Sequence, residues 1–289
     1  MKNTIPLSHD TQGRTLDDRI SALKERSSKR GDLPEITVAT QHEWIDQLAT
    51  FELGRFLLTH QGLNGYWTDY ILLHPENPKE NLTDLEDFIL NRSPVVVATQ
   101  ERFKIFKRET QCRLKSGIQL ASIPCGLMSD LLTLDYRGIE SCRLTGIDID
   151  QESLDIGKKR APHCEWIMAD AWNLPMKDSY DLITSYGLNI YEPDNSRVVS
   201  LYENFYRALK NEGALITSYL APPSEWNTEN IVLKDAEMQR QLFIHVLEPK
   251  FQIFRTQNET EEQLTEAGFN SFQWIPDSQG IFPTVIAKK

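Results

Sequence analysis

Three positions in the second half of the chain could do chemistry together because they recur at a regular spacing. Gly126 lies in the segment IPCGLMSD, Asp148 ends the apolar run CRLTGID, and Asp170 ends the run CEWIMAD. The two intervals are equal, since 148 minus 126 and 170 minus 148 both give 22. In doubly wound sheets the loop after the first strand approaches a ligand with its backbone, and an acid about 20 residues later binds ribose hydroxyls. The spacing therefore indicates a site for an adenosine-containing ligand.

The two acids suit different parts of such a ligand. A carboxylate only accepts hydrogen bonds, so Asp148 fits a ribose diol that can donate twice, and Asp170 fits the amino group of adenine. The backbone N–H of Ala171 could donate to a ring nitrogen beside that amino group. Both acids could instead cap the structure that follows them, which is the interpretation that we favour for the neighbouring Asp150. The shared spacing favours the ligand interpretation for the other two.

Other kinds of reactive site are not indicated by the sequence. The histidines and the four cysteines show neither metal-ligand spacing nor a C-x-x-C pair, so we expect no metal site and reduced thiols. The chain contains no G-x-x-x-x-G-K-[ST] segment, which argues against kinase-type nucleotide use. It also contains no G-x-G-x-x-G segment, which disfavours a nicotinamide-dependent oxidoreductase.

The elements that must position these residues begin near residue 117. Short apolar runs alternate there with helical segments, a pattern typical of a parallel α/β sheet. The runs are IQLASI, CRLTGIDI, CEWIMAD, YDLITSY, ALITSYL, FNSFQWI and TVIAKK. Only PDSQGIFP separates the last two, so they should pair as an antiparallel hairpin without a helix between them. We therefore predict a Rossmann-like, doubly wound and mostly parallel seven-stranded sheet with a reversed strand seven.

The N-terminal part of the chain is predicted to be helical. Three patterns mark helix starts there, namely the capping boxes Thr40-Gln-His-Glu43 and Thr83-Asp-Leu-Glu86 and the pair Ser93-Pro94. We expect a helical lid or cap over residues 1–114 and the sheet domain over residues 115–289. Residues 221–256 are predicted to be a helical insertion that emerges at the carboxyl ends of the strands, where it could act as a lid. A Thr260-x-x-Gln263 box predicts the start of the last helix.

Composition limits the classes of partner. The 289-residue chain has 42 acidic and 31 basic side chains, which give a formal net charge of -11. Such a charge repels phosphate backbones and anionic membrane surfaces, so a small molecule is the favoured partner and nucleic acid is disfavoured. No apolar run approaches the ~20 residues that span a bilayer. The first residues, MKNTIPLSHDTQGRT, contain no apolar core of a signal peptide, so we expect a cytoplasmic protein.

From about residue 115 to residue 289 the chain resembles the class I S-adenosylmethionine-dependent methyltransferases. The segments IPCG, GIDID, ADAWNLP and YDLITSYGLNIY match four motifs of that family in order and spacing. The family's first motif is D-x-G-x-G-x-G, but here Ser122 stands at the acid position, Pro124 at the first glycine and Met128 at the third. Gly126 is retained, and we expect it to supply a positive φ that other residues adopt only at a cost.

The altered first motif should change how the loop meets a ligand. A helix that opens near Ser129 could present backbone donors to the carboxylate of methionine. Met128 and the nearby acid, Asp130, are expected to make that approach bulkier and less attractive to an anion.

The resemblance implies S-adenosylmethionine as the cofactor. It places cofactor contacts at Pro124, Cys125, Gly126, Asp148, Ile149, Asp170, Ala171, Ser185, Tyr186 and Gly187. After the fourth strand, Asn189 and Tyr191 would face the transferred methyl group. Tyr66 and Trp67, in GLNGYWTDY, could cover the sulfonium because aromatic rings attract cations, or could pack the helical region onto the sheet. No catalytic residue is predicted, because a sulfonium is already a good leaving group and methyl transfer depends mainly on positioning.

The sequence therefore predicts S-adenosylmethionine-dependent methyl transfer to an unidentified, small-molecule acceptor. A protein acceptor stays open, whereas SYGLN after strand four replaces the N/D-P-P-Y/F run of enzymes that modify nucleic-acid bases. The alternative is a non-catalytic binding or regulatory module with the same fold, which the variant first motif would also fit.

Overall fold

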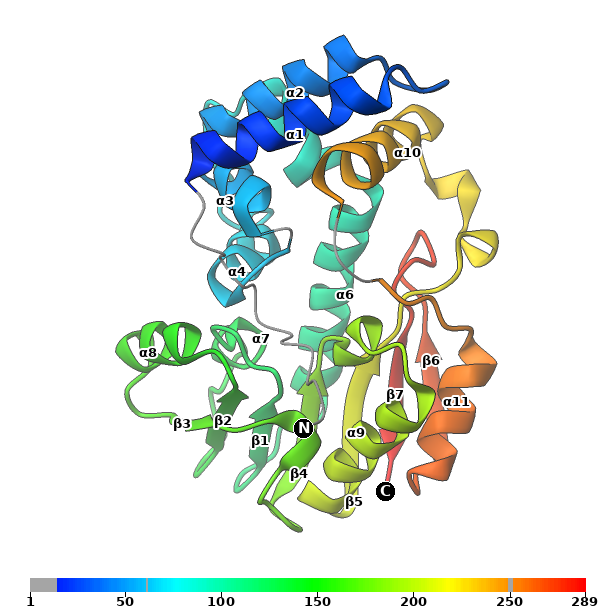
Figure 1. Ribbon diagram of the computed structural model, residues 1–289. Coiled ribbons are helices and arrows are strands. Elements are labelled where there is room, and N and C mark those ends of the chain that lie inside the picture. The colour runs from blue at the N-terminus through cyan, green and yellow to red at the C-terminus, as the bar shows by residue number, and fades with distance from the viewer. Residues whose placement is uncertain (1–14, 61, 249–251) are drawn as a thin grey trace, which may run out of the picture. The chain divides into compact units, whose positions relative to one another are not determined.

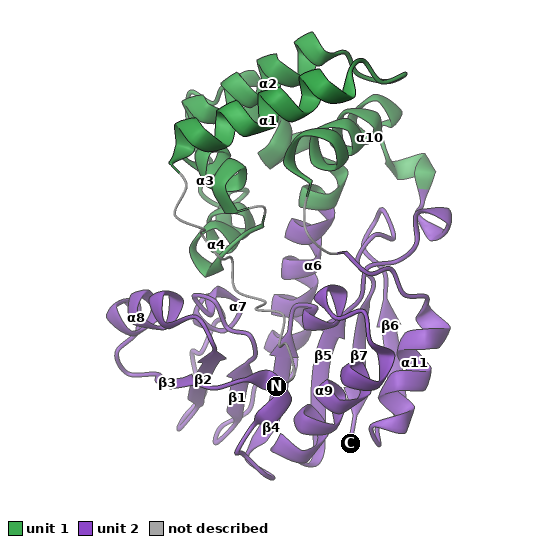
Figure 2. Cartoon of the chain, viewed as in Figure 1, with its two compact units in different colours: residues 1–97, 228–251 green, residues 98–227, 252–289 purple. Residues whose placement is uncertain are grey.

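The computed structural model describes residues 15–60, 62–248 and 252–289. Parts of the predicted helical lid, at residues 1–14 and 61, and of the predicted insertion, at residues 249–251, lie outside the described residues. The chain forms two compact units, one from residues 1–97 and 228–251 and the other from residues 98–227 and 252–289 (Figure 2). In the described part of the chain, no helix is both long and apolar enough to cross a membrane.

The second unit contains the predicted seven-stranded sheet, with the order β3-β2-β1-β4-β5-β7-β6 (Figure 1). β1 pairs in parallel with β2 and β4, whereas β7 runs antiparallel to both β5 and β6. The reversed last strand and the closing hairpin are therefore confirmed. The strands are β1 (Gln119–Ser122), β2 (Arg143–Asp148), β3 (Glu165–Met168), β4 (Tyr180–Ser185), β5 (Leu209–Ser218), β6 (Ser271–Ile275) and β7 (Thr284–Lys288).

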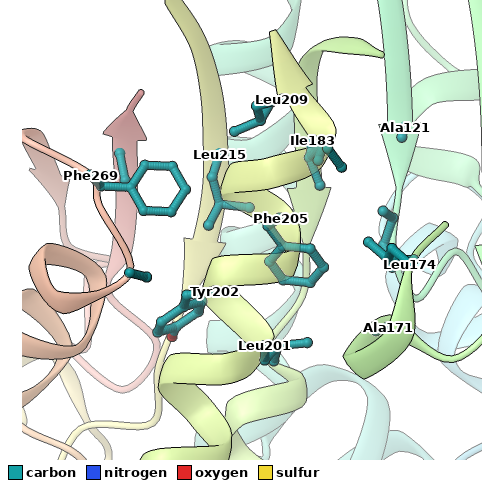
Figure 3. Close-up of a cluster of buried hydrophobic side chains, with 14 of the residues drawn as sticks. Ala121, Ala171, Leu174, Ile183, Leu201, Tyr202, Phe205, Leu209, Leu215 and Phe269 are labelled. Carbon is teal, nitrogen blue, oxygen red and sulfur yellow. The ribbon is translucent and has the colours of Figure 1, made fainter. Parts of the chain in front are cut away.

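Both faces of this sheet are covered because its central strands are apolar on both sides. In β4, Leu182 and Ile183 point to opposite faces and belong to different buried clusters. One cluster packs under α6 (Pro94–Gln111), α7 (Ser129–Leu132) and α8 (Gln151–Arg160). The other packs under α9 (Asn195–Ala208) and α11 (Gln257–Glu266), where Tyr202 and Phe205 of α9 meet Leu215 of β5 (Figure 3).

The two central strands lead to helices on opposite faces. The chain passes from β1 to α7 on one face and from β4 to α9 on the other. This divergence between neighbouring parallel strands is the switch point at which open α/β sheets bind ligands, outside the carboxyl ends of the strands. We therefore expect a ligand site at the loops after β1, β2 and β4.

The first unit is helical, as predicted, and includes the insertion. Its buried cluster joins Leu48 and Phe88 of the N-terminal region to Leu242 and Val246 of the insertion. Ser93 Oγ also donates to Gln239 Oε1 at 2.8 Å. Its elements are α1 (Leu16–Arg30), α2 (Val38–Thr50), α3 (Glu52–His60), α4 (Gly65–Leu73), α5 (Asp84–Asp87), the π-helix η1 (Phe88–Arg92), α10 (Leu233–Arg240) and the π-helix η6 (Gln241–Leu247).

This division differs from the predicted domain boundary after residue 114. Most of α6 belongs to the sheet unit, and residues 228–251 group with the N-terminal helices. Apolar contacts between segments that are far apart in the sequence produce the grouping, and sequence periodicity does not report such contacts.

Two predicted helix starts are wrong by one turn. Thr37, not Thr40, caps α2, and its side chain accepts a hydrogen bond from the backbone of Thr40. Thr256, not Thr260, caps α11 in a reciprocal capping box with Glu259. In both places an earlier threonine was available, and the first competent cap began the helix.

Other predicted boundaries fare differently. The starts of α5, at Thr83, and of α6, at Pro94, are confirmed. α2 ends before Phe51, which adopts an extended backbone conformation, and α3 begins directly after it.

Candidate functional site

The loop after β1 is fastened to the end of β2. Gly126 has a φ of 48°, so the predicted positive φ is confirmed. Its backbone N–H donates to Asp148 Oδ2 at 2.8 Å, and the N–H of Cys125 donates to the carbonyl of Ile147 at 2.9 Å. Pro124 has no N–H to donate. Cys125 and Gly126 are therefore held against the end of β2, which carries the acid that lies 22 residues after Gly126.

Asp148 is positioned by backbone donors. It is 9% exposed, and its Oδ1 accepts from the N–H groups of Ile149 at 2.8 Å and Asp150 at 3.0 Å. Burial raises the pKa of Asp148, and these amide hydrogen bonds oppose the rise. The carboxylate has roughly four lone-pair sites, and these three donors leave one of them, on Oδ2, that can accept from a ligand hydroxyl. Asp150 caps α8 through the N–H of Glu152, as its sequence position predicted.

The tips of β2 and β3 combine polar and apolar groups that fit a nucleoside. Ile149 is 45% exposed and Met168 is 63% exposed, at the adjoining ends of paired strands. Asp170 is exposed and accepts from the N–H of Trp172 at 2.9 Å, so it also caps the short turn that begins at the buried Ala171. The capping and ligand interpretations of Asp170 are compatible, since a carboxylate accepts several hydrogen bonds.

The acid missing from the first motif is supplied by the helix that follows the loop. Asp130, in α7, is 4% exposed, and its Oδ2 accepts from Ser122 Oγ at 3.1 Å and from Thr184 Oγ1 at 2.5 Å. The Asp130 carboxylate thus contacts Ser122, which stands at the acid position of the motif eight residues earlier in the chain. It joins the ends of β1 and β4, and sequence inspection gave it no such role.

The expected crowding by Met128 is wrong. This residue has a φ of 57° and precedes α7, so it keeps the left-handed conformation that glycine would adopt at that position. The strain costs on the order of 1 kcal/mol, but the side chain is 1% exposed and packs in the core with Leu131 and Leu154. The Met128 side chain therefore stabilises the loop by packing into the core.

The exit from β4 presents unpaired polar groups. Gly187 has a φ of 96°, and a Cβ there would lie 2.7 Å from Ile190 Cδ1, so the turn excludes a side chain. Asn189 is 1% exposed, yet neither atom of its amide has a hydrogen-bond partner among the described residues, and the same holds for the buried hydroxyl of Tyr186. Buried polar atoms without partners are costly, so this pattern indicates a place for water or a ligand. Ser185 is buried in the same turn, and Tyr191 is 50% exposed.

Arg255 holds this turn from the far end of the chain. It is 2% exposed, and its guanidinium donates to the carbonyl oxygens of Asn189 and Glu192, each at 2.6 Å. Charged donors make stronger hydrogen bonds than neutral ones, so the contact fixes the backbone on which Asn189 stands. A single arginine in a polar loop carries no sequence signal for this role.

Tyr66 and Trp67 belong to the helical unit, whereas the other predicted site residues belong to the sheet unit. Their rings meet edge to face with centroids 5.0 Å apart, and Trp67 packs against the core of its own unit. Tyr66 is 44% exposed and lines a hollow of about 240 Å³ with Asp69, Tyr70, Leu73, His74 and Asn77. A role in acceptor binding stays a prediction for both.

Metal-dependent chemistry has no evident ligand set in the part of the chain that the structure describes. No three His, Cys, Asp or Glu side chains lie close enough there to hold a metal ion.

Comparison with known proteins gives the arrangement a context. A family model for a methyltransferase domain matches residues 122–213, a span that includes the loop after β1 and the ends of β2, β3 and β4. Demethylmenaquinone methyltransferase of Thermotoga maritima is 35% identical over 97 residues, which are 33% of this chain and 41% of that protein. The match thus spans less than half of the relative.

Two further relatives cover more of the chain. The ubiquinone/menaquinone biosynthesis C-methyltransferase UbiE of Campylobacter jejuni is 27% identical over 206 residues, which are 65% of this chain and 86% of that protein. A solved structure of a possible exported protein from Bordetella parapertussis is 39% identical, with a TM-score of 0.90 over 96% of this chain and 97% of that one.

Asp130 should make stability depend on pH. Burial raises the pKa of Asp130 from 3.8 to about 6, so the folded protein holds this proton more tightly than the unfolded chain. The contribution of Asp130 to stability is fully present below pH 3.8 and is lost as the pH rises through about 6. The loss should amount to about 3 kcal/mol of the free energy of unfolding.

Urea unfolding of Asp130→Asn and of the wild type, at about pH 5 and at about pH 8, tests this expectation. The variant should lose less stability than the wild type between the two conditions. The exposed helical acid Glu152, replaced by Gln, serves as control. Equal pH dependence in all three proteins would contradict the assignment.

Proposed function

We propose that this chain, which belongs to the class I S-adenosylmethionine-dependent methyltransferase family, transfers a methyl group from that cofactor to a small-molecule acceptor. The observation that carries the proposal is the hydrogen bond between Gly126 N–H and the Asp148 carboxylate, which lies beside the switch point of the sheet. S-adenosylmethionine is the cofactor of the family and supplies an activated methyl group on a sulfonium.

The residues present fit this cofactor. Asp148 would accept from the ribose, and Ile149 and Met168 offer exposed apolar surface for adenine. The unpaired amide of Asn189 offers a donor and an acceptor for the methionine part of the cofactor. Asp170 and the N–H of Ala171 are proposed to contact the adenine edge. Pro124 and Cys125 would shape the loop without donating, because one lacks an N–H and the other uses its own.

Positioning is the main task of these side chains. Burial raises the pKa of Tyr186 well above its ordinary value, so the hydroxyl stays protonated and is suited to donate a hydrogen bond. The turn at Gly187 and the contacts of Arg255 keep Asn189 in place beside it. A fixed arrangement of this kind lowers the barrier by holding the nucleophile in line with the methyl group.

An aromatic small molecule, such as a hydroquinone, is the acceptor that we propose to test first. The names of the Thermotoga and Campylobacter relatives refer to quinone methylation, which supports this choice. The net charge of -11 disfavours nucleic acid. The four cysteines are free thiols, which supports a reducing compartment, and we propose the cytoplasm.

Replacing Asp148 by Asn or Ala should weaken the binding of S-adenosylhomocysteine, the demethylated cofactor, at least about tenfold, because charge-assisted bonds to the ribose are lost. Isothermal titration measures the affinity. Asp150→Ala is the matched control, since it removes the neighbouring helix cap at a cost of about 1 kcal/mol in stability and should leave affinity nearly unchanged. Failure of the wild-type protein to bind either form of the cofactor would refute the proposed function.

Gly126→Ala should lower affinity for S-adenosylhomocysteine and also lower stability. The added Cβ strains a residue with a φ of 48° in the loop that approaches the cofactor. Gly138 has a φ of 79° with open space around it, so Gly138→Ala imposes similar strain away from the loop. Both variants should lose about 1 kcal/mol of stability, and only the first should bind the cofactor more weakly. Equal affinities would show that the loop does not approach the ligand.

A further inference from the structure

A buried arginine lies beside the exit from β4 and plays no part in the site described so far. Arg102, in α6, is 7% exposed, and its Nη1 donates to Ser218 Oγ at 3.1 Å. The guanidinium carbon lies 4.4 Å from the centre of the Phe282 ring and 5.7 Å from that of Tyr186. All four residues belong to the sheet unit.

Arg102 forms no ion pair or hydrogen bond with an acidic side chain among the described residues. Arg102 Nε is buried and forms no hydrogen bond there. Asp277 is the acid whose charge acts on Arg102, but its carboxylate accepts instead from the backbone N–H groups of Gln279, Ile281 and Phe282. A buried charge without a partner costs several kcal/mol, so a protein retains one mainly where something else supplies the opposite charge.

The free edge of the guanidinium determines which ligand it fits. Nη1 is bound to Ser218 and Nε has no partner, and in a planar guanidinium the Nε–H group points in the same direction as one N–H of Nη2, on the edge away from Nη1. Two parallel donors match the two oxygens of a carboxylate, and they also suit the single oxygen of a phenolate. The rings of Phe282 and Tyr186, over which the guanidinium lies, favour an anion carried on an aromatic scaffold.

Arg102 lies at other strands than the residues proposed to approach the ribose. Ser218 ends β5 and pairs in register with Thr284 of β7, whereas Gly126 and Asp148 follow β1 and β2. β4 lies between β1 and β5, so the two places are on the order of 10 Å apart at the usual strand spacing. An anion at Arg102 is therefore better supplied by the acceptor than by the ribose end of the cofactor.

We propose that Arg102 binds a carboxylate or phenolate oxygen of an aromatic methyl acceptor. The inference rests on the proposed methyl transfer and adds a charge requirement to the acceptor. A second source of the same chemistry is the methionine carboxylate of the cofactor, and the experiment separates the two.

The test measures probe binding by isothermal titration, with and without saturating S-adenosylhomocysteine, to wild type and to Arg102→Gln. The probes are 4-hydroxybenzoate, 4-nitrophenolate and the uncharged 4-hydroxybenzyl alcohol. Wild type should bind at least one anion about tenfold more tightly than the alcohol, and Arg102→Gln should remove that preference, a difference of about 1.4 kcal/mol. Arg102→Lys keeps the charge but not the paired donors, so it should retain part of the preference.

Controls make the result specific. Arg108, on the same helix, has a side chain that is 58% exposed, and Arg108→Gln should leave every affinity unchanged. Melting temperatures check that each variant is folded, and Arg102→Lys carries the test if Arg102→Gln is not. Absence of anion preference in the wild type, or its persistence in a folded Arg102 variant, would overturn the proposal.

The cofactor arm of the experiment identifies the other source. If Arg102 binds the methionine carboxylate, Arg102→Gln will weaken S-adenosylhomocysteine but not 5′-methylthioadenosine, which lacks that carboxylate, and the acceptor assignment is then wrong. Wild-type binding of S-adenosylhomocysteine tests the proposed function separately, because anion binding without cofactor binding would remove methyl transfer and leave the arginine site standing.

Discussion

The hydrogen bond from Gly126 N–H to Asp148 is the contact on which the rest of the site depends. It fastens the loop after β1 to the tip of β2 and fixes the direction of a carboxylate that burial alone would penalise. Three backbone donors satisfy that carboxylate, so its position is determined by the backbone and not by a mobile side chain. A ligand that approaches this edge therefore meets an acceptor that is already oriented, which reduces the cost of ordering it on binding.

The variant first motif keeps the physical functions of the usual motif with different residues. The positive φ values occur at Gly126 and Met128, and the acid is supplied by Asp130 through Ser122. The loop thus has two residues with positive φ and a buried acid although three of the motif's characteristic residues have changed. A buried acid bonded to hydroxyls on both β1 and β4 also resists separation of those strand ends, because opening them would leave a carboxylate without partners.

Much of the fold could be predicted from local patterns. The seven apolar runs became seven strands, and those at the centre of the sheet are apolar along most of their length because they are buried on both faces. The spacing that linked Gly126, Asp148 and Asp170 also reflects regular βα units, and it placed all three at strand tips of one sheet. The errors at Thr40 and Thr260 arose because an earlier threonine, Thr37 or Thr256, was also able to cap the helix and did so.

Buried charges were the features that the sequence did not reveal. Asp130, Arg102 and Arg255 resemble surface residues in a polar segment, and their roles follow only from the strands and carbonyl groups that the fold brings to them. The grouping of the insertion with the N-terminal helices was hidden for the same reason, since it depends on apolar contacts between distant segments. Local pattern thus predicted where the site lies, whereas long-range packing determined which charges it contains.

A crystal structure of the protein with S-adenosylhomocysteine tests the central claim most directly. We predict that a ribose hydroxyl lies within hydrogen-bond distance of Asp148 Oδ2, while Gly126 N–H keeps its bond to the same oxygen. Adenosine bound elsewhere on the sheet, or a cleft that stays empty at a saturating concentration of the ligand, would contradict it.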